Sequence, residues 1–194
     1  MPVFNRHLFM VSRSTLKGNV MELKNYIANI SDFPKPGILF RDMSPLLASP
    51  SAFREAIHQM KEYWGGRGVT KIAGFDARGF IIGATLAHEM DLPFIMLRKA
   101  GKLPGKTLST SYGLEYGKDV LEMELGAVGV GDNVLLVDDV LATGGTANAG
   151  AQLLQEAVAR VAGLAVVIEL LELHGRKAFT HEISSLIPFG ESDE

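Results

Sequence analysis

An apolar run that ends in two aspartates constrains this chain more than any other feature. Val134-Leu135-Leu136-Val137 has the continuous hydrophobic character of a strand buried on both faces, as in parallel sheets. Asp138 and Asp139 follow directly, and Thr143-Gly144-Gly145-Thr146 then leads into a helical pattern. Open α/β sheets bind ligands at the carboxyl ends of their strands. The stretch therefore predicts a ligand site in an α/β domain.

The turn after the aspartates has the composition of a phosphate-binding loop. Gly144 and Gly145 let the backbone approach a phosphate closely, and Thr143 and Thr146 add hydroxyl donors. Unpaired N–H groups and the helix dipole favour an anion at a helix start. The two carboxylates would repel a phosphate, but they can accept hydrogen bonds from sugar hydroxyls. The combination predicts a ribose 5-phosphate, with an acidic pair on a solvated, capped turn as the alternative.

Composition and charge exclude several other classes of protein. The 194 residues suit one domain, and the net charge of -3 gives no electrostatic case for binding nucleic acid or an anionic membrane. The absence of cysteine excludes disulfides, thiolate metal sites and cysteine nucleophiles. The five histidines lack the spacing of metal ligands. No lysine follows Gly145 as a triphosphatase P-loop would require, and the glycine fingerprint of dinucleotide-binding domains is absent there.

Helical and strand patterns alternate along the chain, which predicts a parallel sheet with helical crossovers. The first helical spacing starts at Met21 with Leu23, Tyr26, Ile27 and Ile30, and the Pro-rich stretch 31–40 reads as an extended loop. Expected helices are 49–64, 79–90 and 145–161, and expected strands are 70–75, 92–98, 133–139 and 164–173. Segment 99–113 reads as a mobile loop, with 114–117 and 119–125 as a hairpin.

Residues 1–20 differ from the rest of the chain. They hold three basic residues and no acidic one, without the uninterrupted apolar stretch of a signal peptide. We expect a disordered or dispensable extension there, followed by a single domain over residues 21–194.

Four stretches together resemble a known family. The segment 134–147, VLLVDDVLATGGTA, resembles the PRPP-binding signature of type I phosphoribosyltransferases. The segments 33–47, 98–105 and 111–117 resemble the adenine phosphoribosyltransferase family. The resemblance implies an α/β fold in which a parallel sheet carries helices on both faces. It also implies a small N-terminal hood over residues 21–47, which binds the base, and a mobile catalytic loop.

The same resemblance implies a reaction and its partners. Adenine and PRPP would give AMP and pyrophosphate in purine salvage, with Mg²⁺ carried on pyrophosphate and ribose oxygens. A cytoplasmic homodimer without nucleic-acid or membrane partners is implied as well. Two alternatives stay open: a salvage enzyme for hypoxanthine, guanine or xanthine, and a non-catalytic PRPP- or nucleotide-sensing regulator. The charge of -3, the lack of an added helix-turn-helix and the complete loop with Glu115 argue against the regulator.

The resemblance assigns PRPP contacts to two turns and one loop. Asp138 and Asp139 would bind the ribose. The 5′-phosphate would lie on Ala142, Thr143, Gly144, Gly145 and Thr146. Pyrophosphate would contact Ala77, Arg78, Arg98, Lys99 and Lys102, and the family holds a cis peptide that would fall at Asp76–Ala77. A solvated arginine at a helix start is the alternative for Arg78, although a cation there opposes the helix dipole.

The resemblance assigns base recognition and proton transfer to other segments. Phe40 would stack on adenine, the backbone of Leu39 and Arg41 would bond its Watson–Crick edge, and Leu170 would close the other side. For Leu170 a plain core position is an equal alternative. Glu115 would act as the catalytic residue near adenine N7, with Tyr116 packing beside the base or ribose. Periodicity alone would place Glu115 at an outward strand position.

Overall fold

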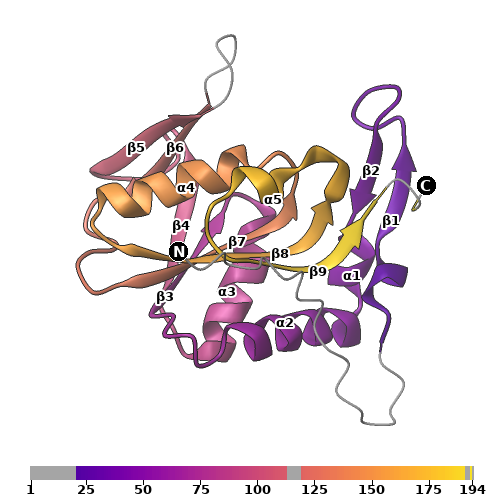
Figure 1. The fold of residues 1–194 in the computed structure, drawn as a ribbon, viewed down its shortest axis with the longest axis horizontal. Coiled ribbons are helices and arrows are strands. Elements are labelled where there is room, and N and C mark those ends of the chain that lie inside the picture. The colour runs from indigo at the N-terminus through magenta and orange to yellow at the C-terminus, as the bar shows by residue number, and fades with distance from the viewer. Residues whose placement is uncertain (1–20, 113–118, 191–192, 194) are drawn as a thin grey trace, which may run out of the picture.

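A seven-stranded sheet forms the centre of the computed structural model, which describes residues 21–112, 119–190 and 193 (Figure 1). The predicted extension, residues 1–20, lies outside the described residues. The strand order is β5-β6-β4-β3-β7-β8-β9. The strands are β3 (Lys71–Phe75), β4 (Phe94–Lys99), β5 (Thr107–Tyr112), β6 (Asp119–Glu124), β7 (Asn133–Leu141), β8 (Arg160–Leu170) and β9 (Ile183–Phe189).

Strand direction divides the sheet into two parts. Strands β4, β3, β7, β8 and β9 run parallel, which confirms the predicted parallel sheet. Strands β5 and β6 form an antiparallel hairpin that joins the sheet through the pairing of β6 with β4. The carboxyl ends of the parallel strands therefore share one edge, where Asp138 and Asp139 follow the buried part of β7.

Helices cover both faces of the sheet, as predicted (Figure 1). Helices α2 (Pro50–Trp64) and α3 (Arg78–Met90) lie on one face, and α4 (Gly145–Glu156) lies on the other. The predicted start of α2 is confirmed, because the Ser49 hydroxyl accepts a hydrogen bond from the Ala52 amide at 3.4 Å. In the predicted inner face of α2, Ile57, Met60 and Trp64 are buried, while Phe53 is only half-buried.

The N-terminal hood differs from its prediction. The helix expected from Met21 is a single 3₁₀ turn, η1 (Leu23–Tyr26), and the chain then forms a hairpin of β1 (Ala28–Ser31) and β2 (Leu39–Asp42), followed by α1 (Ser44–Ala48). Ile30 pairs with Phe40 across this hairpin. Pairing with β2 overrides the helical spacing, because a partner strand satisfies the backbone that a short helix would leave open. The hairpin stands beside the end of β9 (Figure 1).

Three further element predictions are corrected. Part of the expected loop 99–113 is strand β5, and β6 pairs with β5, whereas 114–117, the predicted partner, lies outside the described residues. The helix expected over 145–161 ends at Glu156, and Val158 adopts a left-handed φ of 61° that turns the chain into β8. Strand β8 consequently begins at Arg160. In the part of the chain that the structure describes, no helix has both the length and the apolar character needed to cross a membrane.

Candidate active site

The loop between β7 and α4 encloses a small cavity of about 70 Å³. It is lined by Asp138, Val140, Leu141, Ala142, Thr143, Gly144, Gly145, Thr146, Ala147 and Leu164. The structure therefore brings together every residue predicted for the 5′-phosphate and one of the two predicted for the ribose. Gly144 has a φ of 85°, which glycine adopts without the strain that a side chain would bring. Helix α4 starts directly after it and directs its free N–H groups toward this turn.

A second segment of the chain, a short helix, packs against this loop. Helix α5 (Gly175–Ala178) packs so closely that a side chain at Gly175 would clash with the Ala142 carbonyl oxygen. A Cβ at Gly144 would in turn lie 3.0 Å from the Gly175 carbonyl oxygen. Backbone therefore meets backbone at this contact, and the position of α5 fixes the position of the phosphate loop.

The two aspartates of β7 have different surroundings. Successive side chains of a strand point to opposite faces, so only Asp138 lines the cavity. Burial raises the pKa of the Asp138 carboxyl well above its usual range, and the neighbouring charge of Asp139 adds to the rise. Asp139 is 7% exposed and forms an ion pair with Arg78. The pair thus combines one carboxyl that resists ionisation with one whose charge is neutralised by a cation.

The predicted pyrophosphate turn joins β3 to α3. The peptide between Asp76 and Ala77 is cis, as the family resemblance implied, and Arg78 begins the helix. Gly79 lies so close to β7 that an added Cβ would be 2.7 Å from the Val137 carbonyl oxygen and 3.1 Å from Asp138 Oδ1. This close approach places the turn directly beside the aspartates.

The cations predicted at the end of β4 lie on the same edge of the sheet. Arg98 Nε donates to Asp76 Oδ2 at 2.8 Å, and its Nη1 donates to the Lys102 carbonyl oxygen at 3.0 Å. Lys99 pairs with Asp119 at 3.3 Å. Arg98 is thus attached to the cis-peptide turn through Asp76, a contact that sequence reasoning missed.

Phe40, which is predicted to stack on the base, belongs to an aromatic corner at the hood. The Phe40 ring meets the Phe33 ring edge-on, with centroids 5.2 Å apart, and Arg78 lies 5.6 Å from the Phe40 centroid. Arg41 donates to Asn29 Oδ1 at 2.6 Å and stacks on Phe189, 4.4 Å from the ring centroid. Phe33 opens the 33–47 segment that resembles the family but was given no role of its own, and no sequence signal distinguished Phe189 from an ordinary core residue.

The remaining predicted residues lie on β2 and β8 or outside the described part. Leu39 begins β2 beside Phe40, and Leu170 ends β8 opposite Phe189, half-buried. Both therefore lie beside the aromatic corner, through their strand neighbours. Glu115 and Tyr116 lie outside the described residues, so their predicted roles stay predictions.

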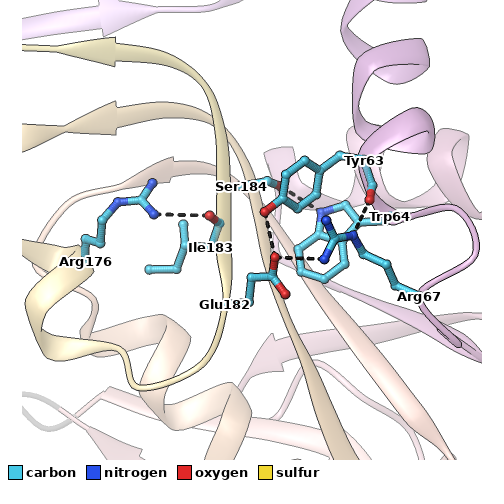
Figure 2. A network of polar contacts seen from close by, with 7 residues as sticks. All are labelled: Tyr63, Trp64, Arg67, Arg176, Glu182, Ile183 and Ser184. Atoms are coloured by element: carbon cyan, nitrogen blue, oxygen red, sulfur yellow. Dashed lines mark hydrogen bonds and ion pairs between the residues drawn. The ribbon is translucent and has the colours of Figure 1, made fainter. Parts of the chain in front are cut away.

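A buried ion pair behind α5 was also missed. Glu169 is 3% exposed and accepts two hydrogen bonds from Arg176, at 2.8 and 2.6 Å, and one from Ser185 at 2.5 Å. Arg176 also donates to the Ile183 carbonyl oxygen at 3.1 Å (Figure 2). A glutamate inside the otherwise apolar run of β8 was the available signal, since such residues are rarely buried without a partner.

Comparison with known proteins agrees with this geometry. Residues 44–186 match the family model described as phosphoribosyl transferase domain. The adenine phosphoribosyltransferase of Methylococcus capsulatus is 54% identical over 157 residues, which cover 81% of this chain and 92% of that protein. The crystal structure of the Rhodothermus marinus enzyme superimposes with a TM-score of 0.82 at 44% identity, covering 86% of this chain and 96% of that one.

A more distant relative carries ligands. The Saccharomyces cerevisiae adenine phosphoribosyltransferase, complexed with an imino-altritol bisphosphate and adenine, has a TM-score of 0.80 at 36% identity over 84% of this chain and 96% of that one. Sequence similarity, fold and the arrangement of the loops agree. The chain belongs to the adenine phosphoribosyltransferase family.

Proposed function

We propose that this protein transfers the phosphoribosyl group of PRPP to adenine at the cavity of the β7–α4 loop, with the hood binding the base. Its family catalyses the reaction of adenine with PRPP to AMP and pyrophosphate, a step of purine salvage. One observation carries the assignment to this site. Arg78 pairs with Asp139 beside the cavity and also lies over Phe40 of the hood, so the PRPP-binding and base-binding segments meet at one point.

Different groups of residues would bind the different parts of PRPP. The N–H groups of the 142–146 loop would bind the 5′-phosphate, and the carboxylates of Asp138 and Asp139 would accept hydrogen bonds from ribose hydroxyls. Arg78 and Arg98, supported by Lys99 and Lys102, would bind pyrophosphate. Binding would then exchange the Arg78–Asp139 ion pair for contacts with the substrate, pyrophosphate taking the cation and ribose the carboxylate.

The hood would recognise adenine. Phe40 presents an aromatic face for stacking, and the backbone of Leu39 and Arg41 offers an acceptor and a donor for the Watson–Crick edge. The adenine complex of the yeast relative supports a base site in this fold. High identity to adenine-specific relatives favours adenine over hypoxanthine, guanine and xanthine, and a catalytic role over a regulatory one.

The transfer forms one bond to C1′ and breaks another, and adenine also gives up a proton. Adenine N9 attacks C1′ of the ribose while the bond from C1′ to the pyrophosphate oxygen breaks, and the N9 proton leaves. Positive charge grows on the sugar, and the carboxylates of Asp138 and Asp139 would stabilise it in their ionised form. Glu115 would stabilise the charge on the adenine imidazole ring near N7 or accept the proton.

Magnesium dependence is part of the proposal. Carboxylate oxygen is a ligand type that Mg²⁺ prefers, and Asp138 supplies it at the cavity. Within the described residues, no group of three or more histidine, aspartate or glutamate side chains could hold a metal ion. The family resemblance implies an ion carried mainly on PRPP oxygens. When bound, Mg²⁺ lowers the negative charge of the departing pyrophosphate. A homodimeric assembly and a cytoplasmic location follow from the family resemblance alone.

An assay of the purified protein with PRPP and each purine base tests the proposal. Adenine should react about ten- to a hundredfold faster in kcat/KM than hypoxanthine or guanine. Their 6-oxo group is an acceptor where adenine offers a donor, and an unmade buried hydrogen bond costs about 1–3 kcal/mol. Activity should disappear with EDTA and return with Mg²⁺. Equal rates with hypoxanthine would contradict the base assignment, and full activity in EDTA would contradict the metal dependence.

A further inference from the structure

A second hollow, of about 560 Å³, lies at the other end of the sheet from the phosphate loop. Asn133 begins β7 and Arg160 begins β8, so this hollow opens at the amino ends of the parallel strands. It is lined by Arg67, Gly68, Asn133, Gln155, Ala159, Arg160, Val161 and His181, which we call the basic hollow.

The basic hollow is separate from the candidate active site. On β7, Asn133 lines the basic hollow, and Asp138, five residues further along the strand, is the first residue that lines the cavity of the phosphate loop. At a rise of about 3.3 Å per residue, these two positions lie roughly 16 Å apart. A ligand in the basic hollow would therefore not contact the phosphate loop, and neither the loop residues nor the hood contributes to its lining.

Charge and hydrogen-bonding groups in the basic hollow favour an anion. Arg67, Arg160 and His181 line it, and no aspartate or glutamate does. In the described part of the chain Arg160 forms no ion pair, while Arg67 pairs with Glu182 at 2.9 Å. One of the two arginine charges is thus left without a neutralising carboxylate. The amide side chain of Gln155 adds neutral donor and acceptor groups.

Contacts with Tyr63, near the end of α2, and with Glu182, just before β9, hold Arg67 in place (Figure 2). Its Nε donates to the Tyr63 carbonyl oxygen at 2.5 Å, and its guanidinium stacks 4.3 Å from the Tyr63 ring centroid. Glu182 accepts from Arg67 Nη1 and also from the Tyr63 hydroxyl at 2.7 Å. A cation fixed by these three contacts loses little conformational freedom when it binds a ligand.

We propose that the basic hollow binds a small molecule through a phosphate group. Arginine guanidinium groups match the geometry of phosphate oxygens and bind them with two parallel hydrogen bonds. The volume lies within the usual range of about 300–1,000 Å³ for small-molecule sites. The phosphate can belong to inorganic phosphate or to a nucleotide, and the titration described next distinguishes the two.

Amide chemical shifts of the full-length ¹⁵N-labelled protein test the proposal. Inorganic phosphate and AMP are titrated separately, with sodium chloride at matched ionic strength as the reference. Saturable shifts at Gly68, Gln155 and Arg160 with both ligands would show that phosphate suffices, and shifts with AMP alone would show that a nucleotide is required. Amides of 143–146 report active-site binding in the same spectra. No saturable shift at the basic hollow with either ligand overturns the proposal.

Substitutions of Arg160 and Arg67 test whether these two cations are responsible for the binding. Arg160→Ala should weaken binding at the basic hollow at least about tenfold, as the loss of a charged hydrogen bond implies, while phosphoribosyl transfer continues at the normal rate. Arg160 is exposed, so the variant should fold. Arg67→Ala provides a second test from the other wall. Thr143→Ala with Thr146→Ala should change only the loop signals. Unchanged binding in both arginine variants would overturn the proposal.

Discussion

Arg78 at the start of α3 forms an ion pair with Asp139 near the end of β7. The side chain of Asp139 is 9% exposed, so its charge depends on a partner for stabilisation, whereas Arg78 is 46% exposed and can turn toward a ligand. The same guanidinium lies over the Phe40 ring. One side chain therefore links the start of α3, the end of β7 and the hood, three segments to which PRPP and base binding are assigned here as a proposal.

A double-mutant cycle tests this link. Arg78→Gln and Asp139→Asn should each raise the KM for PRPP about tenfold, since each removes a charged partner of the substrate. The double variant should fall short of the product of the two effects, with a coupling of about 0.5–3 kcal/mol, because the residues contact each other. Steady-state kinetics measures all four proteins. The exposed Lys61–Glu89 pair, 3.5 Å apart on α2 and α3, provides a matched control cycle without an expected effect on PRPP.

The buried carboxyl of Asp138 should lower the stability of the folded protein at neutral pH, while it is expected to contribute to PRPP binding. Its folded pKa is raised by burial, so the folded state binds more protons than the unfolded state between the ordinary pKa near 3.8 and the raised value. Stability consequently falls as pH rises through that window, and the penalty persists at neutral pH. Asp138→Asn removes it. We expect a higher Tm at pH 7, by about 2–4 °C for each kcal/mol gained, together with weaker PRPP binding.

The pH dependence of this variant separates titration from packing. The gain in Tm should shrink toward pH 4 and vanish below it, where both states of the wild-type carboxyl are protonated. Thermal unfolding of both proteins from pH 4 to pH 8 measures the difference. Glu172→Gln, a change at an exposed carboxylate, is the control and should leave the profile unaltered. A Tm gain that is constant with pH would show that packing is its cause.

Sequence predicted the part of the site that is built from consecutive residues. The 138–146 segment forms a strand end, a turn and a helix start, so local physics fixes its shape, and all of its residues except Asp139 line one cavity. The hood was mispredicted because its conformation depends on pairing. Ile30 fits a helical spacing, but β1 forms where β2 can reach it, and that contact spans the stretch 32–38.

Contacts between segments that are distant in the chain could not be predicted from the sequence for the same reason. Thr107–Tyr112 reads as a polar loop, yet it forms β5 because β6 supplies a partner along one edge. The ion pair of Arg98 with Asp76 and the stacking of Arg41 on Phe189 join residues from different elements. No local pattern encodes such partners. Glu169 is an exception. A glutamate within the apolar run of β8 is a local sign that a cation lies nearby, although it does not identify Arg176 as that cation.

The Glu169–Arg176 pair should support PRPP binding through α5. Arg176 follows Gly175, whose backbone lies against the phosphate loop, and its side chain fastens that turn to β8 and β9. Arg176→Ala leaves the Glu169 charge buried without its cation, which costs about 3 kcal/mol for a buried pair and less here because Arg176 is partly exposed. We expect a lower Tm and a several-fold higher KM for PRPP, with the KM for adenine little changed.

The pH profile of this loss follows from Glu169. Burial alone would raise the pKa of the Glu169 carboxyl, but the hydrogen bonds from Arg176 and Ser185 outweigh it and hold the pKa below its usual range. A lowered folded pKa contributes stability above the unfolded value near 4.5, and this stability is lost as pH falls through the folded pKa. The Tm difference between wild type and Arg176→Ala should therefore be largest at neutral pH and shrink in acid. An unchanged KM for PRPP would restrict the pair to a structural role.

A substitution of Glu115 should lower the catalytic rate and leave PRPP binding largely unchanged. When N9 attacks C1′, the adenine imidazole ring carries positive charge until its proton leaves, and a carboxylate near N7 can stabilise that charge or accept the proton. General acid–base help is worth about 10²–10⁴-fold, so Glu115→Gln should lower kcat by that range. The KM for PRPP should change much less, because the 142–146 loop and Arg78 are expected to bind PRPP. Glu124→Gln, at the exposed end of β6, is the matched control. Near-normal kcat in Glu115→Gln would remove the residue from the mechanism.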